Sequence, residues 1–453
     1  MTVETINPWT GAVEYRYDYF DAAQVEKRLA ASARAFPVWS ALSFAERAGF
    51  LRRTAELLRE HRGRIAGIMT AEMGKLRREA LAEVEKSAGA CEYYAAQAEI
   101  YMQDKVIATE ATRSFVAYEP IGCVFAVMPW NFPIWQVFRF LAPGLMAGNV
   151  ALLKHATNVP RCADVIAEMI RLAGIPEGVF DVLHIDNQDA AAVIADPRVH
   201  AITLTGSERA GKSVAGNAGA NLKKCVMELG GSDPFVVLDD ADLDKAIPVA
   251  VASRFGNGGQ TCIAAKRFIL TPGIAAEFVS RFTAAAAALK SGDPNDDATT
   301  LAPMVRPDAR DFLQQQVDAS VAAGAKVILG GSKGNGPCDY PATILDAVKP
   351  GMVAYSEELF GPVASIIRAT DEDDAVRIAN DTAFGLGASV WTRDKARGEA
   401  LARRIQAGAV FVNSLVRSDV RLPFGGTKTS GFGRELAEHG IHEFMNIKTV
   451  YVD

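Results

Sequence analysis

The sequence predicts an α/β protein with two α/β domains in succession, and three observations support this fold class. Short strand-forming runs alternate with helical segments from about residue 123 to residue 413, which is typical of βαβ units and parallel sheets. The 453 residues are enough for two large domains with an appendage, and the 49% hydrophobic content is ample for a large core. No short repeat or low-complexity tract interrupts the alternation.

The first hundred residues are predicted to be helical. Ser43-Phe44-Ala45-Glu46 has the spacing of a capping box, and apolar residues recur at helical intervals through 46–62. A second long helix is predicted over roughly 77–103. Residues 113–128 alternate in polarity and turn at Glu119-Pro120-Ile121-Gly122, which predicts two strands around a reversal.

The alternating region divides into two halves near residue 230. In the first half, strands are predicted at 123–128, 150–153, 179–185, 201–205 and 223–228, and helices at 160–173, 189–195 and 210–218. In the second half, strands are predicted near 235–238, 266–270, 326–329, 363–369, 387–391 and 409–413, and helices at 242–254, 273–289, 308–323, 371–380 and 394–406. Residues 446–453 predict a terminal strand, which must pair with something, another subunit being one option.

Composition narrows the class of protein further. The 48 basic and 54 acidic residues give a net charge of −6, and no block of Lys and Arg stands out, which argues against a general nucleic-acid binder. The six cysteines are scattered without a CxxC pair or a metal-type spacing, so we expect reduced thiols, no metal site and a cytoplasmic location. The N-terminus shows no secretory signal.

Residues 120–153 contain a single charged side chain, Arg139. Prolines interrupt this apolar stretch too often for a membrane span, so we expect a buried core segment and no membrane association. Arg139 is then an isolated cation in an apolar neighbourhood, and such a charge needs a partner.

Cys262 ends a glycine-rich run, Phe255-Gly256-Asn257-Gly258-Gly259-Gln260-Thr261-Cys262. Glycines let a ligand approach the backbone closely, and a thiol there suits nucleophilic catalysis if a nearby group can take its proton. Glu228 is the candidate base, 262 − 228 = 34 residues upstream. The alternative is a buried structural cysteine.

Two features of the first half suit a nucleotide. Residues 201–211 form a strand, a glycine turn at Gly206 and a helix start, where free N–H groups and the Ser207 hydroxyl could hold phosphate oxygens. Lys154 closes the apolar strand 150–153, at the strand end where open α/β sheets bind ligands. An ordinary βα turn and a solvated lysine are the alternatives, since the turn is not GxGxxG.

Six short motifs stand in a fixed order along the chain. They are Pro129-Trp130-Asn131-Phe132-Pro133, Leu204-Thr205-Gly206-Ser207, Glu228-Leu229-Gly230-Gly231, Gly259-Gln260-Thr261-Cys262, Glu357-Glu358-Leu359-Phe360-Gly361-Pro362 and Pro423-Phe424-Gly425-Gly426. In this order and spacing they resemble the aldehyde dehydrogenase superfamily over essentially the whole chain. The resemblance implies two Rossmann-like α/β domains and a small β oligomerisation element. The implied boundaries are 1–102 and 121–230 for the cofactor-binding domain, 231–430 for the catalytic domain, and 103–120 with 443–453 for the oligomerisation element.

The resemblance also implies roles for individual residues. Cys262 would be the nucleophile, Glu228 the general base, and Asn131 an oxyanion-hole donor together with the Cys262 N–H. The residues expected to hold NAD or NADP are Trp130, Lys154, Thr157, Thr205, Gly206, Ser207, Leu229, Glu358 and Phe360, with Glu358 on the nicotinamide ribose. Hydride transfer would leave a thioester, which a carboxylate-activated water hydrolyses. Members that pass the acyl group to coenzyme A are not expected to carry a glutamate at 228, so the implied product is a free acid.

A closer resemblance is to the shorter bacterial succinate-semialdehyde dehydrogenases. It rests on Leu152-Leu153-Lys154-His155-Ala156, Lys223-Lys224-Cys225-Val226, Ser232-Asp233-Pro234-Phe235, Ala264-Ala265-Lys266-Arg267-Phe268 and Gly431-Phe432-Gly433-Arg434-Glu435-Leu436. It implies oxidation of succinic semialdehyde to succinate, with Arg139 gripping the distal carboxylate of the substrate. An internal salt bridge is the alternative role for Arg139.

Two positions depart from related enzymes. The longer succinate-semialdehyde enzymes carry an arginine six residues before the nucleophile, where this chain has Gly256. Arg254 is nearby but off register, whereas Ser418, Arg417 or Arg421 could substitute, and Ser418 is expected to be a substrate residue. NAD-preferring relatives often carry a glutamate three residues after the strand-end lysine, where this chain has Thr157. A neutral residue there admits either cofactor.

Other functions were weighed against this one. An enzyme acting on another aliphatic or aromatic aldehyde is the nearest alternative, and a catalytically idle structural or binding protein is the alternative from another class. A cysteine hydrolase is weaker, because none of the six histidines has a motif tying it to Cys262. The implied assembly is a homodimer or homotetramer.

Overall fold

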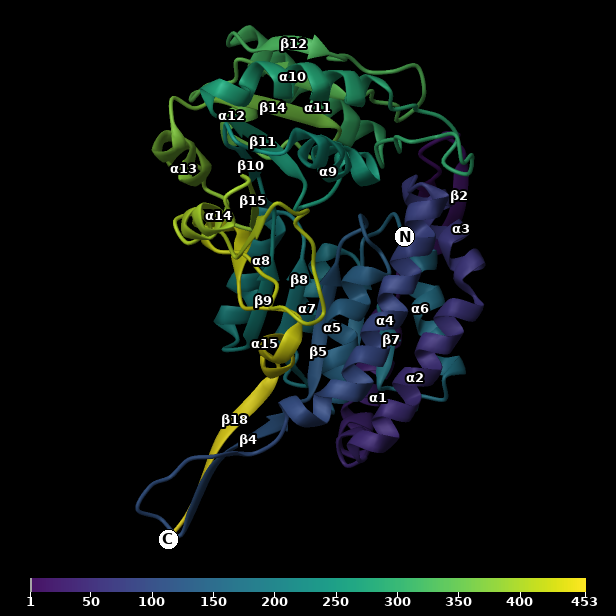
Figure 1. The fold of residues 1–453 in the computed structure, drawn as a ribbon. Helices are drawn as coiled ribbons and strands as arrows, with labels where there is room; N and C mark the ends of the chain where they lie inside the picture. Colours follow the sequence, from purple (N-terminus) through teal and green to yellow (C-terminus); the bar gives the residue numbers. More distant parts are fainter. Residues whose placement is uncertain (1) are drawn as a thin grey trace.

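The computed structural model describes residues 2–453 and is built around two large, mostly parallel sheets. In Figure 1 the sheet of the second half lies at the top, and the sheet of the first half lies below it, flanked by the N-terminal helices. A long arm projects from the bottom and carries the C-terminus. Both sheets arise from the predicted alternation of strand and helix, which confirms the α/β fold class.

The lower sheet has six strands in the order β17-β9-β8-β5-β6-β7, all parallel except β17. They are β5 (Cys123–Met128), β6 (Val150–His155), β7 (Phe180–Val182), β8 (Val199–Thr205), β9 (Lys224–Glu228) and β17 (Gly431–Phe432). The central strands read as nearly continuous apolar runs because helices cover both faces. The helices of this half are α1 (Ala22–Ser40), α2 (Phe44–Glu60), α3 (Arg62–Met73), α4 (Arg77–Tyr101), α5 (Trp135–Met146), α6 (Pro160–Leu172), α7 (Asn187–Ala195) and α8 (Glu208–Ala220).

The upper sheet has seven strands in the order β12-β13-β14-β11-β10-β15-β16, all parallel except β12. They are β10 (Asp233–Val237), β11 (Ala265–Leu270), β12 (Lys326–Leu329), β13 (Thr343–Asp346), β14 (Val363–Arg368), β15 (Gly387–Trp391) and β16 (Ala409–Val412). Two separate apolar clusters pack against it. The helices of this half are α9 (Leu243–Phe255), α10 (Pro272–Ala287), α11 (Pro307–Ala322), α12 (Val353–Ser356), α13 (Glu372–Asn380) and α14 (Lys395–Ala402).

The arm is a third sheet of three strands. β18 (Met445–Val452) pairs antiparallel with β4 (Arg113–Pro120) along its whole length, and β4 also pairs with the short β3 (Lys105–Val106). The short helix α15 (Ala437–His442) leads into β18. The predicted terminal strand is therefore present, and its partner within this chain is β4.

The N-terminal prediction was partly wrong. The capping box is confirmed at the start of α2, where Ser43 accepts from the Glu46 N–H and Glu46 accepts from the Ser43 N–H. The first residues, however, form the antiparallel pair β1 (Thr2–Ile6) and β2 (Val13–Asp18) instead of a helix. β1 is rich in β-branched residues and β2 carries a valine and two tyrosines at alternate positions, a composition that favours strands.

The predicted reversal at 119–122 also differs from the structure. Both strands are present, but β4 belongs to the arm and β5 to the lower sheet, so they form no hairpin with each other. β5 is almost wholly buried, whereas most residues of β4 are only half-buried, in keeping with its place in the arm. The buried segment expected around Arg139 is confirmed as helix α5. Among residues 2–453, no helix combines the length and apolar character needed to cross a bilayer.

Candidate active site

Cys262 follows a tightly held loop between α9 and β11. The 3-10 turn η1 (Gly256–Gly259) contains three consecutive residues with positive φ, Asn257, Gly258 and Gly259. A Cβ at Gly259 would lie 2.4 Å from the Gly361 carbonyl oxygen, so only glycine fits there. The glycines therefore serve the shape of the loop that presents the thiol.

Asn131 is tied to the same loop by several hydrogen bonds. Its Nδ2 donates to the Gln260 carbonyl at 3.0 Å, and its own carbonyl accepts from Asn257 Nδ2 at 3.0 Å and from Lys75 Nζ at 2.8 Å. Lys75 in turn forms a buried ion pair with Glu83, whose other oxygen accepts the first backbone N–H groups of α5. Two loops that are distant in sequence are thus fixed against each other. An amide has two N–H donors, so Asn131 keeps one for a ligand.

Cys262 opens onto a cavity of about 320 Å³ between the two halves of the molecule. Trp135 and Arg139 from α5 line it, as does Ser418 from the loop that follows β16. The cavity wall is mainly apolar, with a few polar groups, which is the usual composition of a small-molecule site.

Burial raises the pKa of the Cys262 thiol to about 11, although the nearby cations Arg139 and Lys266 oppose that rise. Lys266, at the start of β11, donates to the Cys262 carbonyl at 2.7 Å and to the Thr261 carbonyl at 3.0 Å. The thiol thus lies in a largely apolar environment, and the Lys266 ammonium contacts the backbone carbonyl of the same residue.

Glu228 ends β9 and is buried, 2% exposed. Neither carboxyl oxygen has a hydrogen-bond partner among residues 2–453. Burial and the neighbouring Glu435 hold the pKa of this carboxyl well above its usual range. A Cβ at Gly425 would lie 2.7 Å from Glu228 Oε1, so the carboxyl fits against a backbone without a side chain.

Arg139 has the partner that its isolation in the sequence requires. It forms a buried ion pair with Glu435, donates to Thr205 Oγ1 at 3.1 Å, and lies over the Phe424 ring at 4.8 Å from its centroid. This is the internal salt bridge weighed as the alternative to substrate binding. Arg139 also lines the cavity, so its role toward substrate stays a prediction.

The predicted phosphate-binding turn has the expected local structure. Ser207 caps α8, its hydroxyl accepting from the Ala210 N–H at 3.3 Å. A Cβ at Gly206 would lie 3.6 Å from the Leu204 side chain and 3.8 Å from Ala210 Cβ, which are ordinary contacts. Lys154 lies near the end of β6, where burial lowers its pKa. Thr157, just beyond, is exposed, and its carbonyl accepts from the Tyr17 hydroxyl at 2.9 Å.

Glu358 belongs to the loop between α12 and β14, in the second half of the chain. Glu358 accepts from the Gly231 N–H at 3.1 Å and pairs with Lys266 at 3.2 Å. A Cβ at Gly230 would lie 2.4 Å from Glu358 Oε2, so this carboxylate needs the glycine beneath it. The rings of Trp130 and Phe360 meet edge to face with centroids 5.8 Å apart. Leu229 packs against Gly211 at the first turns of α8.

These features fit a dinucleotide. The helix N-terminus at Ser207 suits a diphosphate, a strand-end lysine suits a ribose, and the Glu358 carboxylate over paired glycines suits a second ribose. Residues 2–453 contain no group of His, Cys, Asp and Glu side chains arranged to hold a metal ion.

Neither Arg254, which is off register, nor Arg421, a possible substitute for the arginine missing at Gly256, lines the cavity. Arg254 is fully buried and donates to the carbonyls of Gly259 and Gly361 at 2.6 and 2.7 Å, so it holds the loop. Arg421 pairs with Asp419 on the surface. Arg417 and Ser418 both line the cavity with Gly256.

Sequence reasoning missed the residues that support the site. Lys75, Glu83 and Lys266 act through contacts with backbone atoms of other segments, and a single sequence gives no sign of such contacts. Lys266 stands within a motif used for the resemblance, but nothing in that motif indicated its pairing with Glu358.

Comparison with known proteins agrees with this geometry. A sequence model of the aldehyde dehydrogenase family matches residues 1–450. A protein of Synechocystis sp. named a probable succinate-semialdehyde dehydrogenase [NADP(+)] is 49% identical over 453 residues, covering all of both chains. A succinate semialdehyde dehydrogenase [NAD(P)+] of Escherichia coli K12 is 47% identical over 450 residues, covering 99% of this chain and 97% of that one.

Among solved structures, a succinic semialdehyde dehydrogenase from Streptococcus pyogenes in complex with NADP+ superposes with a TM-score of 0.97. It is 36% identical, and the match covers 99% of each chain.

Proposed function

The chain belongs to the aldehyde dehydrogenase family, and on that premise we propose that it oxidises succinic semialdehyde to succinate with NAD or NADP. The observation that carries the proposal is the Cys262 loop fixed to Asn131 at one cavity between the two sheets. The names of the relatives, at 46–49% identity over the whole chain, support the substrate and the cofactors.

The first step uses Cys262 and Asn131. The Cys262 thiolate forms a bond to the aldehyde carbon, giving a thiohemiacetal whose oxyanion accepts from the free amide N–H of Asn131 and the Cys262 N–H. Nicotinamide, when bound, accepts the hydride that leaves this carbon. Loss of hydride converts the thiohemiacetal to a thioester on Cys262.

Glu228 serves the second step. In the arrangement described, Glu228 is not among the residues that line the cavity, and burial and Glu435 raise the pKa of its carboxyl. We propose that the side chain rotates toward the cavity and there, as the carboxylate, takes a proton from the water that attacks the thioester. Hydrolysis then releases succinate and regenerates the thiol.

The cofactor residues follow from the same geometry. Ser207 and the N-terminus of α8 would hold the diphosphate, Lys154 the adenosine ribose, and Glu358 the nicotinamide ribose. Trp130, Phe360, Leu229, Thr205 and Gly206 would form the walls of this site. Thr157 is neutral and exposed, which leaves room for the 2′-phosphate of NADP.

Assembly and location are part of the proposal. We propose a homodimer or homotetramer in which the arm of one chain contacts another chain, and a cytoplasmic enzyme. The support is the exposed apolar side chains of the arm and the reduced, scattered cysteines.

The proposal is tested by following reduced nicotinamide with succinic semialdehyde and with butyraldehyde, each with NAD and with NADP. Butyraldehyde matches the substrate in chain length but has no carboxylate. We expect kcat/KM for the semialdehyde to exceed that for butyraldehyde by at least about tenfold, the worth of one hydrogen bond to a charged group. Equal kcat/KM values would instead support an enzyme that acts on another aldehyde. If neither aldehyde is turned over, the alternative of a catalytically idle protein is supported.

A further inference from the structure

Lys86 lines the cavity that contains Cys262, and neither sequence reasoning nor the mechanism above uses it. It lies on α4, one turn after Glu83, and keeps accessible surface. Its Nζ donates to Ser418 Oγ at 2.7 Å and lies over the Trp135 ring, 4.1 Å from the centroid. An ammonium is thus held at the cavity wall by two residues of other segments.

Two of the other cations that line the cavity are already neutralised, while Arg417 is exposed and has no ion pair among residues 2–453. Lys75 pairs with Glu83, and Arg139 pairs with Glu435. Lys86 has no carboxylate within ion-pair distance among residues 2–453, since its one polar partner is a neutral hydroxyl. An ammonium has three N–H donors, so Lys86 keeps two of them for a ligand.

Ser418 is set to act with Lys86. Its oxygen accepts from Lys86 Nζ and also from Trp135 Nε1 at 3.2 Å. With both acceptor positions used, its own hydroxyl proton is left to donate. A cation and a hydroxyl donor side by side are complementary to a carboxylate.

We infer that Lys86, together with Ser418, binds the distal carboxylate of the substrate, so that the aldehyde end is directed toward Cys262. This inference rests on the proposed function and adds a residue that determines its specificity. Arg139 then stays paired with Glu435 and forms part of the cavity wall, so this ion pair need not break when substrate binds.

The competing explanation is structural. Through Ser418, Lys86 also links α4 to the loop that follows β16, across 332 residues of sequence. If Lys86 is only a structural link, its replacement should change kcat/KM equally for charged and neutral aldehydes. If Lys86 binds the substrate carboxylate, its replacement should lower kcat/KM for the charged aldehyde alone.

The test compares Lys86→Gln, Lys86→Arg and the unchanged protein on succinic semialdehyde and butyraldehyde. For Lys86→Gln we expect the ratio of the two kcat/KM values to fall roughly 10- to 100-fold, mainly through the KM for the semialdehyde, as one hydrogen bond to a charged group is lost. Lys86→Arg keeps the charge and should retain more of the ratio. Lys212→Gln is the matched control, because Lys212 is a surface lysine on α8 that pairs only with Glu208.

A pH profile of the unchanged protein gives a second readout that needs no variant to fold. Enclosure by protein lowers the pKa of Lys86 to about 8, with Arg139 and Arg417 adding to that fall and Glu83 and Asp419 opposing it. The ammonium therefore loses its proton as pH rises through about 8. The KM for succinic semialdehyde should rise there while that for butyraldehyde does not follow, and Lys86→Arg should abolish the difference.

The outcomes separate the inference from the function it rests on. If the unchanged protein shows no preference for the semialdehyde, the proposed function fails. If that preference is present but survives in Lys86→Gln, with the pH dependence of the KM unaltered in Lys86→Arg, then Lys86 is a structural link and the inference is overturned. A thermal melt of each variant reports whether it is folded.

Discussion

The reactivity of Cys262 is set by two opposing influences at the scale of one residue. Removal from water disfavours the thiolate, while Arg139 and Lys266 favour it, and the balance leaves the pKa raised to about 11. The thiol is therefore largely protonated at neutral pH when no ligand is bound. Activation must then accompany ligand binding or a proton acceptor reaching the cavity.

This balance predicts how the free protein reacts with iodoacetamide. Because only the thiolate reacts, the rate of inactivation should rise close to tenfold per pH unit from about pH 7 to about pH 10. The measurement is residual dehydrogenase activity after timed exposure at each pH. Cys225→Ser, which removes a partly exposed thiol elsewhere, should give the same profile. A plateau already reached below about pH 8 would contradict the environment described for Cys262.

Single residues also show where the sequence was informative. Cys262, Glu228 and Asn131 could be proposed because each stands in a motif, and the structure ties Asn131 by hydrogen bonds to Asn257 and Gln260 of the loop that precedes Cys262. Arg139 was noticed only through its isolation, and its partner Glu435 could not be predicted. That pair joins residues 139 and 435, and such distant contacts leave no local pattern.

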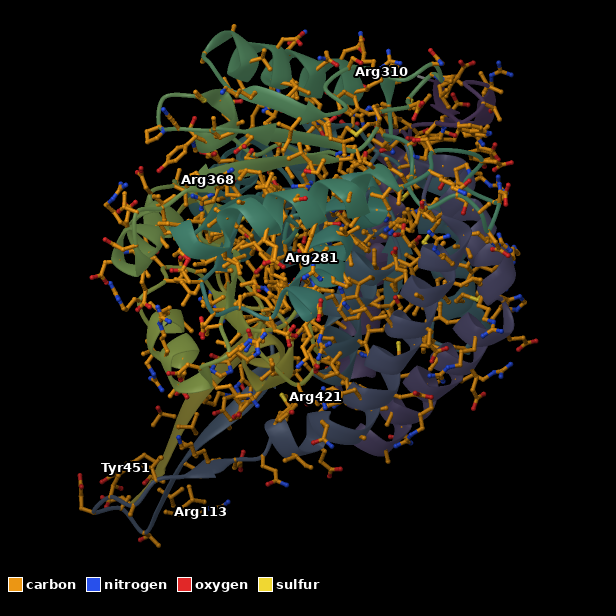
Figure 2. The ribbon with its side chains drawn as sticks, turned by 45° about the horizontal axis from the view of Figure 1, so that its top comes forward. Arg113, Arg281, Arg310, Arg368, Arg421 and Tyr451 are labelled. Atoms are coloured by element: carbon orange, nitrogen blue, oxygen red, sulfur yellow. The ribbon has the colours of Figure 1, made fainter. Side chains whose placement is uncertain are left out.

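At the scale of elements, the arm stands apart from the rest of the fold. β18 has β4 on one side, and its other edge has no partner within residues 2–453. Ile447 and Tyr451 lie on the same face of β18 and are 60% and 50% exposed. Figure 2 shows Tyr451 and Arg113 far out on the arm, away from both large sheets. A strand edge and apolar side chains exposed in this way favour contact with a second chain.

The arm therefore predicts a change in assembly when its apolar face is made acidic. Ile447→Asp combined with Tyr451→Asp should lower the molar mass in light scattering from an oligomer toward the 48.5 kDa of one chain. Leu222→Asp is the matched control, because Leu222 is 96% exposed in a turn far from the arm in sequence. An unchanged mass for the arm variant would place the interface elsewhere.

Elements were predicted well where their sequence pattern is local. Most strands of both parallel sheets and most flanking helices follow from alternation, because apolar runs and helical periodicity act over a few residues. Strand β13 of the upper sheet was not predicted. The pair β1 and β2 was missed, since short polar strands on the surface have no apolar run. β4 and β5 were found, but their separation into different sheets depends on β18, more than 320 residues further along the chain.

At the scale of the whole molecule, the site exists only where the two halves meet. α4 and α5 come from the first half, the Cys262 loop from the start of the second, and Ser418 from near the end. The boundaries proposed for the three domains stay a prediction. The order of strands within each sheet and the contact between the halves could not be predicted, because both depend on long-range packing.

The central claim is that Cys262 carries a covalent acyl group which Glu228 helps to hydrolyse. Rapid mixing of Glu228→Gln with succinic semialdehyde and cofactor tests it directly. We predict a burst of about one reduced nicotinamide per chain, followed by steady turnover roughly a thousandfold slower than that of the unchanged protein, because the thioester forms and then persists. Steady turnover at the unchanged rate, or a burst that survives in Cys262→Ala, would contradict the account.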